Sequence, residues 1–190
     1  TDNGISISVN QNRSRGYNAI VNPGDYSYNP DRDGYRFDTV QVNGALTPSS
    51  KLKLGLSAFE TRGKSQYDGD SNYDDRIVSV VNNVSATADF QATDAWLGTL
   101  RLGSGGEKSA FDSTFPGNYR TRHDQFTWQN TLRIGTSLSL LGAAEWRRES
   151  VSGTDSLPVT ARRTSSALIG GDWTLEAWRL NTSVRLDDST

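Results

Sequence analysis

Apolar and polar residues alternate with a period of two along several stretches of the chain. Between Trp178 and Asp187, apolar residues and one threonine hold the even positions, while charged or polar residues hold the odd ones. The same alternation runs through residues 51–58, 126–134 and 138–146. A β-strand sends successive side chains to opposite faces, and no helical period fits these runs. The pattern therefore predicts strands with one apolar and one polar face.

Turn residues between these runs divide the chain into about nine strands. We expect them near residues 4–16, 35–47, 51–65, 77–90, 95–106, 122–134, 137–150, 163–173 and 177–188. The connections alternate in length. Short turns lie at residues 47–50, 91–94, 135–136 and 174–176, and long polar segments lie at residues 17–34, 66–76, 107–121 and 151–162.

Short periplasmic turns and long extracellular loops are typical of bacterial outer-membrane barrels. Composition favours the same interpretation, because 34% hydrophobic residues and a mean hydropathy of -0.63 are low for a soluble core of 190 residues. No run approaches 18 apolar residues, which argues against a membrane helix but not against a membrane strand. The chain is thus predicted to be all-β, an antiparallel transmembrane β-barrel in a bacterial outer membrane with lipid as its partner.

Large aromatic residues are expected to form girdles at the two membrane interfaces. Near the short turns these are Phe90, Trp96, Trp173 and Trp178, and near the long loops they are Tyr35, Phe37, Phe59 and Trp146. The alternative is that the aromatic side chains fill the core of a soluble β-sandwich.

An odd number of strands with sheet at both ends would leave two unpaired edges, which lipid does not tolerate. We therefore expect residues 1–190 to form one partial barrel domain, an arc of a larger barrel whose plug and remaining strands lie outside the chain. The start at Thr1 and the absence of methionine favour such a piece. Cysteine is absent too, and a net charge of -2 with a pI near 5.4 gives no sign of a nucleic-acid partner.

Catalytic constellations are lacking, so the chain is not expected to be an enzyme. His123 is the single histidine, and no serine nucleophile is placed beside it by the sequence. The glycine-rich segment 103–109 superficially resembles a phosphate-binding loop, but Glu107 replaces the glycine before Lys108. Its glycines fit better with a strand that runs out into a loop.

Clustered carboxylates in the long loops carry the chemical signal. The second loop holds Asp68, Asp70, Asn72 and Asp74 at alternating positions, and the first ends with Asp31 and Asp33. Carboxylate and amide oxygens on flexible loops suit Ca²⁺, which takes six to eight oxygen ligands. The pattern is not an EF-hand, because Tyr73 replaces its glycine and Ser79 its glutamate. Solvated surface aspartates are the alternative.

The order of several short motifs resembles TonB-dependent outer-membrane transporters, most closely those that take up cobalamin. The motifs span almost the whole chain: Arg15-Gly16-Tyr17, Asp31-Arg32-Asp33-Gly34-Tyr35, Gln66-Tyr67-Asp68, Asp74-Asp75-Arg76, Thr93-Asp94-Ala95-Trp96, Phe126-Thr127-Trp128-Gln129-Asn130 and Arg185-Leu186-Asp187-Asp188-Ser189.

This resemblance implies a plugged barrel of about 22 strands, of which the chain would supply nine. It further implies uptake of a corrinoid, driven by the TonB complex acting on the plug, with extracellular loops ordered by Ca²⁺. The implied metal ligands are Asp31, Asp33, Asp68 and Asp74. Asn18 joins them, standing where the family has an aspartate, so the site loses one charge. A passive porin or structural barrel, and a soluble Ca²⁺-binding β-sandwich adhesin module, remain as alternatives.

Overall fold

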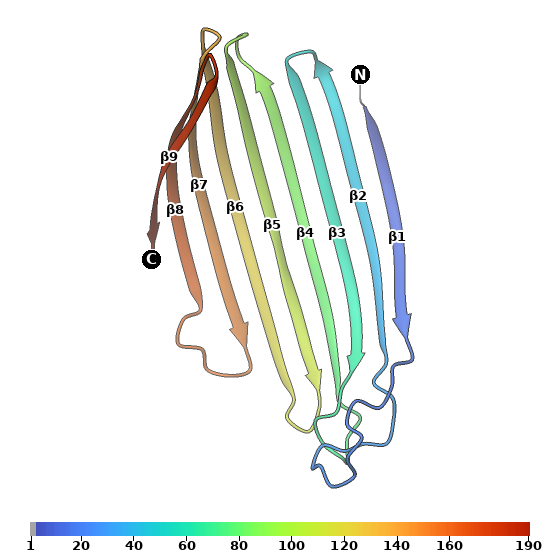
Figure 1. Ribbon diagram of the computed structural model, residues 1–190. Coiled ribbons are helices and arrows are strands. Elements are labelled where there is room, and N and C mark those ends of the chain that lie inside the picture. Colours follow the sequence, from blue (N-terminus) through green and yellow to red (C-terminus); the bar gives the residue numbers. More distant parts are fainter. Residues whose placement is uncertain (1–2) are drawn as a thin grey trace.

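The computed structural model describes residues 3–190, which form one antiparallel sheet of nine strands in chain order (Figure 1). The strands are β1 (Gly4–Ser14), β2 (Tyr35–Ser49), β3 (Leu52–Gln66), β4 (Arg76–Gln91), β5 (Trp96–Asp112), β6 (Gly117–Ile134), β7 (Leu138–Gly153), β8 (Ala161–Leu175) and β9 (Trp178–Ser189). The all-β prediction and the number of strands are confirmed.

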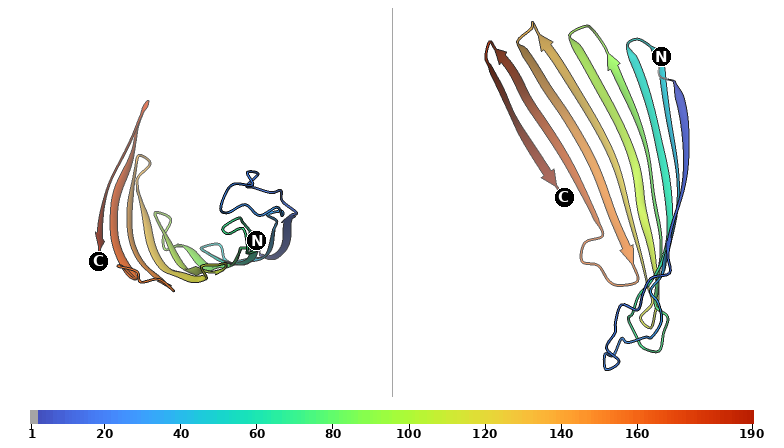
Figure 2. Two further views of the ribbon diagram at one scale, coloured as in Figure 1. Left: turned by 90° about the horizontal axis from the view of Figure 1, so that it is seen from below. Right: turned by 45° about the vertical axis from the view of Figure 1, so that its right-hand side comes forward.

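The sheet curves into an open arc, seen along its strands in Figure 2. Among residues 3–190, β1 pairs only with β2, and β9 pairs only with β8. The same residues include no helix long and apolar enough to cross a membrane. The short turns meet at one end of the arc and the longer connections at the other, as the alternation in length predicted.

Cross-strand register assembles one continuous apolar face. Leu102 of β5 lies opposite Phe126 of β6, which lies opposite Trp146 of β7. In the other direction Leu102 lies opposite Ala86 of β4, which lies opposite Leu56 of β3. Partners in a register share a face, so the apolar positions of successive strands join into a band around the arc. In a barrel this face meets lipid.

The sheet is a single layer without a hydrophobic core. Within the described part of the chain, no apolar side chain is buried, and Trp178 and Leu186 are 80% and 72% exposed. A β-sandwich would hide these side chains between two sheets about 10 Å apart. The described residues thus form a single layer and not a sandwich, and their apolar band has the arrangement of the outer face of a membrane barrel.

The third long loop predicted at residues 107–121 is wrong. β5 continues to Asp112 and β6 starts at Gly117, so only residues 113–116 connect them. Here one face presents Lys108, Ala110 and Asp112 and the other presents Glu107, Ser109 and Phe111, so neither face is consistently apolar. Where the alternation is lost in this way, the sequence of a strand resembles that of a loop.

The two predicted aromatic girdles differ in outcome. Near the short turns, register places all four predicted rings on the apolar face, namely Phe90, Trp96, Trp173 and Trp178. Near the long connections only Trp146 lies on that face. Tyr35, Phe37 and Phe59 belong to the opposite, polar face. There the Phe37 ring covers Gly63, whose missing side chain makes room: a Cβ would come within 2.4 Å of the ring.

A positive charge in the apolar band should destabilise the folded sheet. Leu100 lies on β5 between Trp96 and Leu102 on the apolar face, so Leu100→Arg should lower the free energy of unfolding in lipid by about 2–4 kcal/mol. Its control, Gln129→Arg, places the same charge on the polar face of β6 and should cost less than about 1 kcal/mol. Urea titration of the complete protein in lipid vesicles measures both, and equal losses would contradict the assignment of faces.

Candidate functional site

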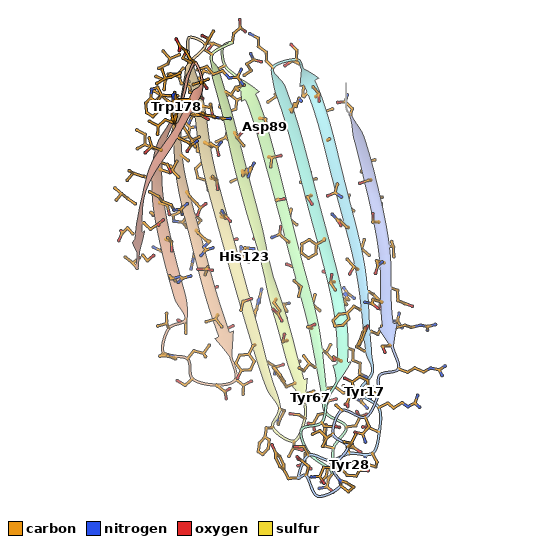
Figure 3. The ribbon with its side chains drawn as sticks, in the orientation of Figure 1. Tyr17, Tyr28, Tyr67, Asp89, His123 and Trp178 are labelled. Carbon is orange, nitrogen blue, oxygen red and sulfur yellow. The ribbon has the colours of Figure 1, made fainter. Side chains whose placement is uncertain are left out.

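The connection between β1 and β2 (residues 15–34) and that between β3 and β4 (residues 67–75) pack against each other at one end of the arc. The amide N–H of Ser71 donates to the carbonyl of Tyr26 at 3.3 Å, joining the two connections through their backbones. Figure 3 shows Tyr17, Tyr28 and Tyr67 gathered at this end, with Trp178 at the other. Two segments far apart in sequence therefore share one surface.

Gly16 gives the first connection its path. Its φ is +65°, a left-handed conformation that favours glycine, and a Cβ there would lie 1.9 Å from the carbonyl oxygen of Asp33. Next to it, the amide N–H of Asp33 donates to the carbonyl of Tyr17 at 3.1 Å. The glycine of the Arg15-Gly16-Tyr17 motif thus allows the start and end of this connection to close on each other.

Three carboxylates converge where the two connections meet. Asp31, Asp33 and Asp68 each offer an oxygen, and these oxygens all lie within 4.8 Å of one another. All three side chains are partly buried. Asp33 Oδ2 accepts the amide N–H of Ala19 at 3.1 Å, and Asp68 Oδ2 accepts that of Ile20 at 3.2 Å. Backbone amides thus hold two of the carboxylates in place.

Burial and the nearness of like charges both raise the pKa values of carboxyl groups in this cluster. Burial raises the pKa of Asp31 above its usual value, and the charges of Asp33 and then Asp74 raise it further. Burial followed by the charge of Asp33 likewise raises the pKa of Asp68, partly offset by the Ile20 amide. Asp31 Oδ1 is shielded from solvent and has no hydrogen-bond partner. A shielded, unpaired carboxylate oxygen among other carboxylates fits a cation.

Asn18 lies beside this group of three, whereas Asp74 lies outside it. Asn18 Oδ1 accepts the Ile20 amide at 3.1 Å, the same N–H that Asp68 accepts. Asp74 forms an ion pair with Arg76 and accepts a hydrogen bond from Gln66 Nε2 at 3.0 Å. The hydrogen bonds from Arg76 and then Gln66 lower the pKa of Asp74.

Asp75 shapes the second connection, a role that the sequence did not single out. It is only 2% exposed, and its Oδ2 accepts the amides of Gly69 and Asp70 at 3.1 and 2.9 Å. Its carbonyl also accepts the amide of Tyr67 at 3.1 Å. The available signal was its place in the Asp74-Asp75-Arg76 motif. Asp75 thus holds the loop that presents Asp68.

His123 lies on the polar face of β6, away from this site (Figure 3). Its Nε2 is 3.3 Å from Asn83 Nδ2, and its cross-strand neighbours are Gly105 and Glu149. No serine lies opposite His123 in the register. His123 is thus a polar residue that shares a hydrogen bond with Asn83 on the polar face of the sheet.

No known family model matches the chain. Over 193 aligned residues it is 24% identical to a vitamin B12 transporter, BtuB, of Photobacterium profundum, covering 96% of this chain and 30% of that protein. It is 23% identical to BtuB of Vibrio cholerae, covering 97% of this chain and 31% of that protein. The chain therefore spans about a third of the length of these curated relatives.

The solved structure of the ferric yersiniabactin uptake receptor FyuA of Yersinia pestis superposes with a TM-score of 0.64 at 12% identity. The match covers 99% of this chain and 39% of the receptor. The fold is thus that of a segment of a TonB-dependent receptor barrel, and the resemblance found in the sequence is confirmed. Among the curated relatives, the chain is similar to vitamin B12 transporters, which are not enzymes.

Protonation should tighten the contact between the two connections when no cation is bound. The raised pKa values of Asp31 and Asp68 mean that the folded state binds protons more strongly than the unfolded chain, so stability rises as pH falls through the raised values towards the ordinary value near 3.8. Hydrogen exchange in chelator, corrected for intrinsic rates, should show residues 15–34 becoming more protected on acidification.

Asp31→Asn should reduce this pH response, because it removes a carboxyl with a raised pKa and one of the charges that act on Asp68. Asp94→Asn, in a short turn at the other end of the arc, serves as the control. An unchanged pH response in Asp31→Asn would refute this account of the cluster.

Proposed function

We propose that the chain forms part of the outer-membrane barrel of a TonB-dependent receptor that takes up a scarce nutrient, a corrinoid such as cobalamin. Its two long connections form an outer mouth ordered by Ca²⁺. The observation that carries this proposal is the convergence of Asp31, Asp33 and Asp68 from two connections far apart in sequence. The similarity to vitamin B12 transporters supports a corrinoid as the substrate.

Asp31, Asp33 and Asp68 would be the charged ligands of the ion, with Asn18 supplying an amide oxygen. Ca²⁺ takes oxygen ligands in flexible geometry, and the shielded Asp31 Oδ1 is a free acceptor for it. Burial and then the charge of Asp33 raise the pKa of both Asp31 and Asp68. A bound cation would offset both effects on the charged carboxylates, so it would draw the two connections together. We do not place Asp74 among the direct ligands, because its charge is already neutralised by the ion pair with Arg76.

Uptake through such a barrel requires a partner outside this chain. A plug within the barrel would receive force from the TonB complex, while the ordered mouth would hold the substrate above it. Exposed aromatic side chains at the mouth, among them Tyr17 and Tyr26 at 77% and 84% exposure, offer flat surfaces to a corrin ring.

A passive porin or structural barrel would share the strands but needs no cation-dependent mouth. Binding of cyanocobalamin to the complete protein in detergent, measured by calorimetry with and without Ca²⁺, separates the two functions. A receptor gains affinity when Ca²⁺ is added. A porin binds the corrinoid weakly in both conditions.

Removing a charged ligand should eliminate the gain from Ca²⁺. We expect the single variants Asp33→Ala and Asp68→Ala each to bind cyanocobalamin equally with and without Ca²⁺, because each removes one of the three convergent carboxylates. Asp94→Ala, in a turn at the opposite end, should keep the gain. If both ligand variants also kept it, the metal assignment would fail even if corrinoid binding itself persisted.

Restoring the family's charge at position 18 should strengthen the site. Asn18→Asp adds a carboxylate beside Asp68, and affinity for Ca²⁺ should rise roughly tenfold, about 1.4 kcal/mol. Calorimetric titration with Ca²⁺ alone measures the change. Asn22→Asp, in the same connection, provides a matched control. A gain of the same size in both variants would show only a general charge effect.

A further inference from the structure

The apolar face of the sheet becomes strongly basic beyond the apolar band, at the end with the long connections. We call this surface the basic belt. Register places on it Arg13, Arg36, Arg62, Lys64, Arg76, Lys108, Arg120, Arg122, Arg148 and Arg163. Between these cations the same face also carries four carboxylates, Asp38, Glu60, Asp112 and Asp124, so its cations outnumber its anions. The belt crosses the sheet from β1 to β8, although the chain as a whole has a net charge of -2.

Cations in the basic belt lie directly opposite one another on neighbouring strands. Lys108 of β5 is the partner of Arg120 of β6, and Arg148 of β7 is the partner of Arg163 of β8. A third row joins Arg36 of β2 to a cation on each side, on β1 and β3. Like charges directly opposite destabilise a sheet. Asp124 of β6 lies opposite Arg148 on its other side, whereas Lys108 and Arg120 have Val80 and Ser152 as their other partners. An anion lying between Lys108 and Arg120 would remove their repulsion.

Several cations of the belt have no carboxylate partner. Within residues 3–190, no ion pair is made by Arg13, Lys64, Lys108, Arg120, Arg148 or Arg163. All six are exposed. On the polar face, by contrast, four arginines each lie against a carboxylate, namely Arg147, Arg162, Arg179 and Arg185. Arg101 and Arg133 of the polar face make no ion pair within these residues either, so the belt is distinguished by the grouping of its six unpaired cations.

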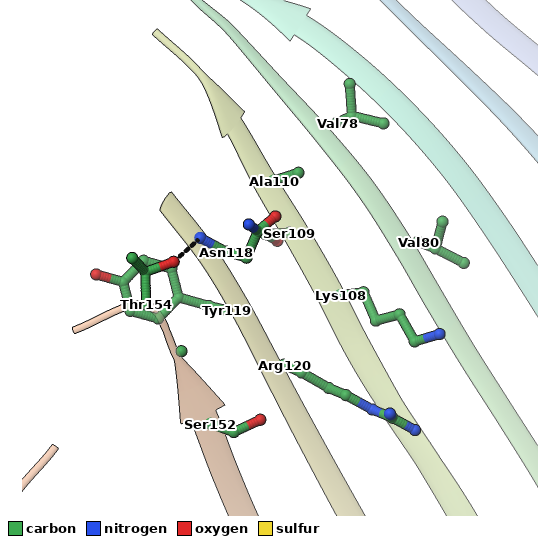
Figure 4. Close-up of a pocket in the computed structure, with 11 residues that line it drawn as sticks. Val78, Val80, Lys108, Ser109, Ala110, Asn118, Tyr119, Arg120, Ser152 and Thr154 are labelled. Carbon is green, nitrogen blue, oxygen red and sulfur yellow. Dashed lines mark hydrogen bonds between the residues drawn. The ribbon is translucent and has the colours of Figure 1, made fainter. Parts of the chain in front are cut away.

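A groove runs between the strands within the belt (Figure 4). It has a volume of about 650 Å³, with Val78, Val80 and Ala110 along one part and Lys108 and Arg120 beside them. A second groove, of about 410 Å³, contains three further cations of the belt, Arg36, Lys64 and Arg76. Apolar and cationic residues alternate over short distances here, which suits a ligand that is itself both anionic and apolar.

The position of the belt relative to the apolar band identifies the level at which this ligand lies. On β7, Arg148 follows Trp146 on the same face, and on β6, Arg122 and Arg120 lie just beyond Phe126. The belt therefore begins where the hydrocarbon contact ends. Phosphates of lipid head groups lie at this level, and the long connections mark the outer leaflet.

We propose that the basic belt binds the phosphate groups of an anionic lipid in the outer leaflet, with its acyl chains lying on the apolar band. A multiply phosphorylated glycolipid fits best, because neighbouring phosphates can bridge the opposed cations. Arginine binds phosphate with paired hydrogen bonds, and basic clusters near a membrane attract anionic head groups. A soluble anion would contact only the cations of the belt, whereas a lipid would contact both the belt and the adjoining apolar band.

The test uses the complete protein in detergent and purified lipopolysaccharide as the probe, with native mass spectrometry as the readout. The belt variant is Lys108→Gln with Arg120→Gln. Its matched control, Arg101→Gln with Arg133→Gln, removes the same charge from the polar face. We expect the belt variant to bind lipopolysaccharide roughly 10- to 30-fold more weakly, and the control to stay within about twofold of the parent.

Two further measurements test whether the phosphate groups of the lipid are what the belt binds. Dephosphorylated lipopolysaccharide should bind the parent protein as weakly as the intact lipid binds the belt variant, and millimolar inorganic phosphate should not displace the lipid. A second variant, Arg148→Gln with Arg163→Gln, provides the same comparison if the first one does not fold. Equal binding by parent and belt variants, equal loss in the control, or full displacement by inorganic phosphate would each overturn the proposal.

Discussion

Backbone hydrogen bonds between neighbouring strands determine the shape of the whole sheet and the faces of its side chains. A strand in a membrane has no water for its N–H and C=O groups, so each strand must pair along its length with the next one. The nine strands do so in chain order, with nearly unbroken registers. Because register partners share a face, a local alternation in each strand becomes a continuous band across the sheet. The same registers align the cations of the basic belt.

How far the fold could be predicted from the sequence follows from what each face of a strand meets. The alternation from Trp178 to Asp187 is clear because one face meets lipid and the other does not. At residues 107–112 both faces mix polar and apolar side chains, and the strand was mistaken for a loop. The rings of Tyr35 and Phe37 were assigned to the lipid-facing girdle because they are near a loop. Their odd positions on β2, however, put them on the opposite face from the apolar Val40 and Val42. Parity, not proximity, decides the face.

Part of the candidate site was predictable and part was not. The resemblance named Asp31, Asp33 and Asp68, and the structure brings their oxygens together. The resemblance named Asp74 as well, yet Arg76 two residues further along forms an ion pair with it. The function of Asp75 depends on two amide groups that turn towards it only when the loop is folded. Contacts of that kind arise from three-dimensional closure, and no spacing of residue types reveals them.

The mouth also combines two kinds of order. Asp75 folds the β3–β4 connection with hydrogen bonds of its own, so Asp68 is held in place before any ion arrives. The β1–β2 connection is closed by a hydrogen bond between Asp33 and Tyr17, and it meets the other connection through the amides of Ile20 and Ser71. Each connection is thus held by hydrogen bonds of its own. An ion bound between them would mainly restrict the movement of one connection relative to the other, and little conformational entropy would be lost within each.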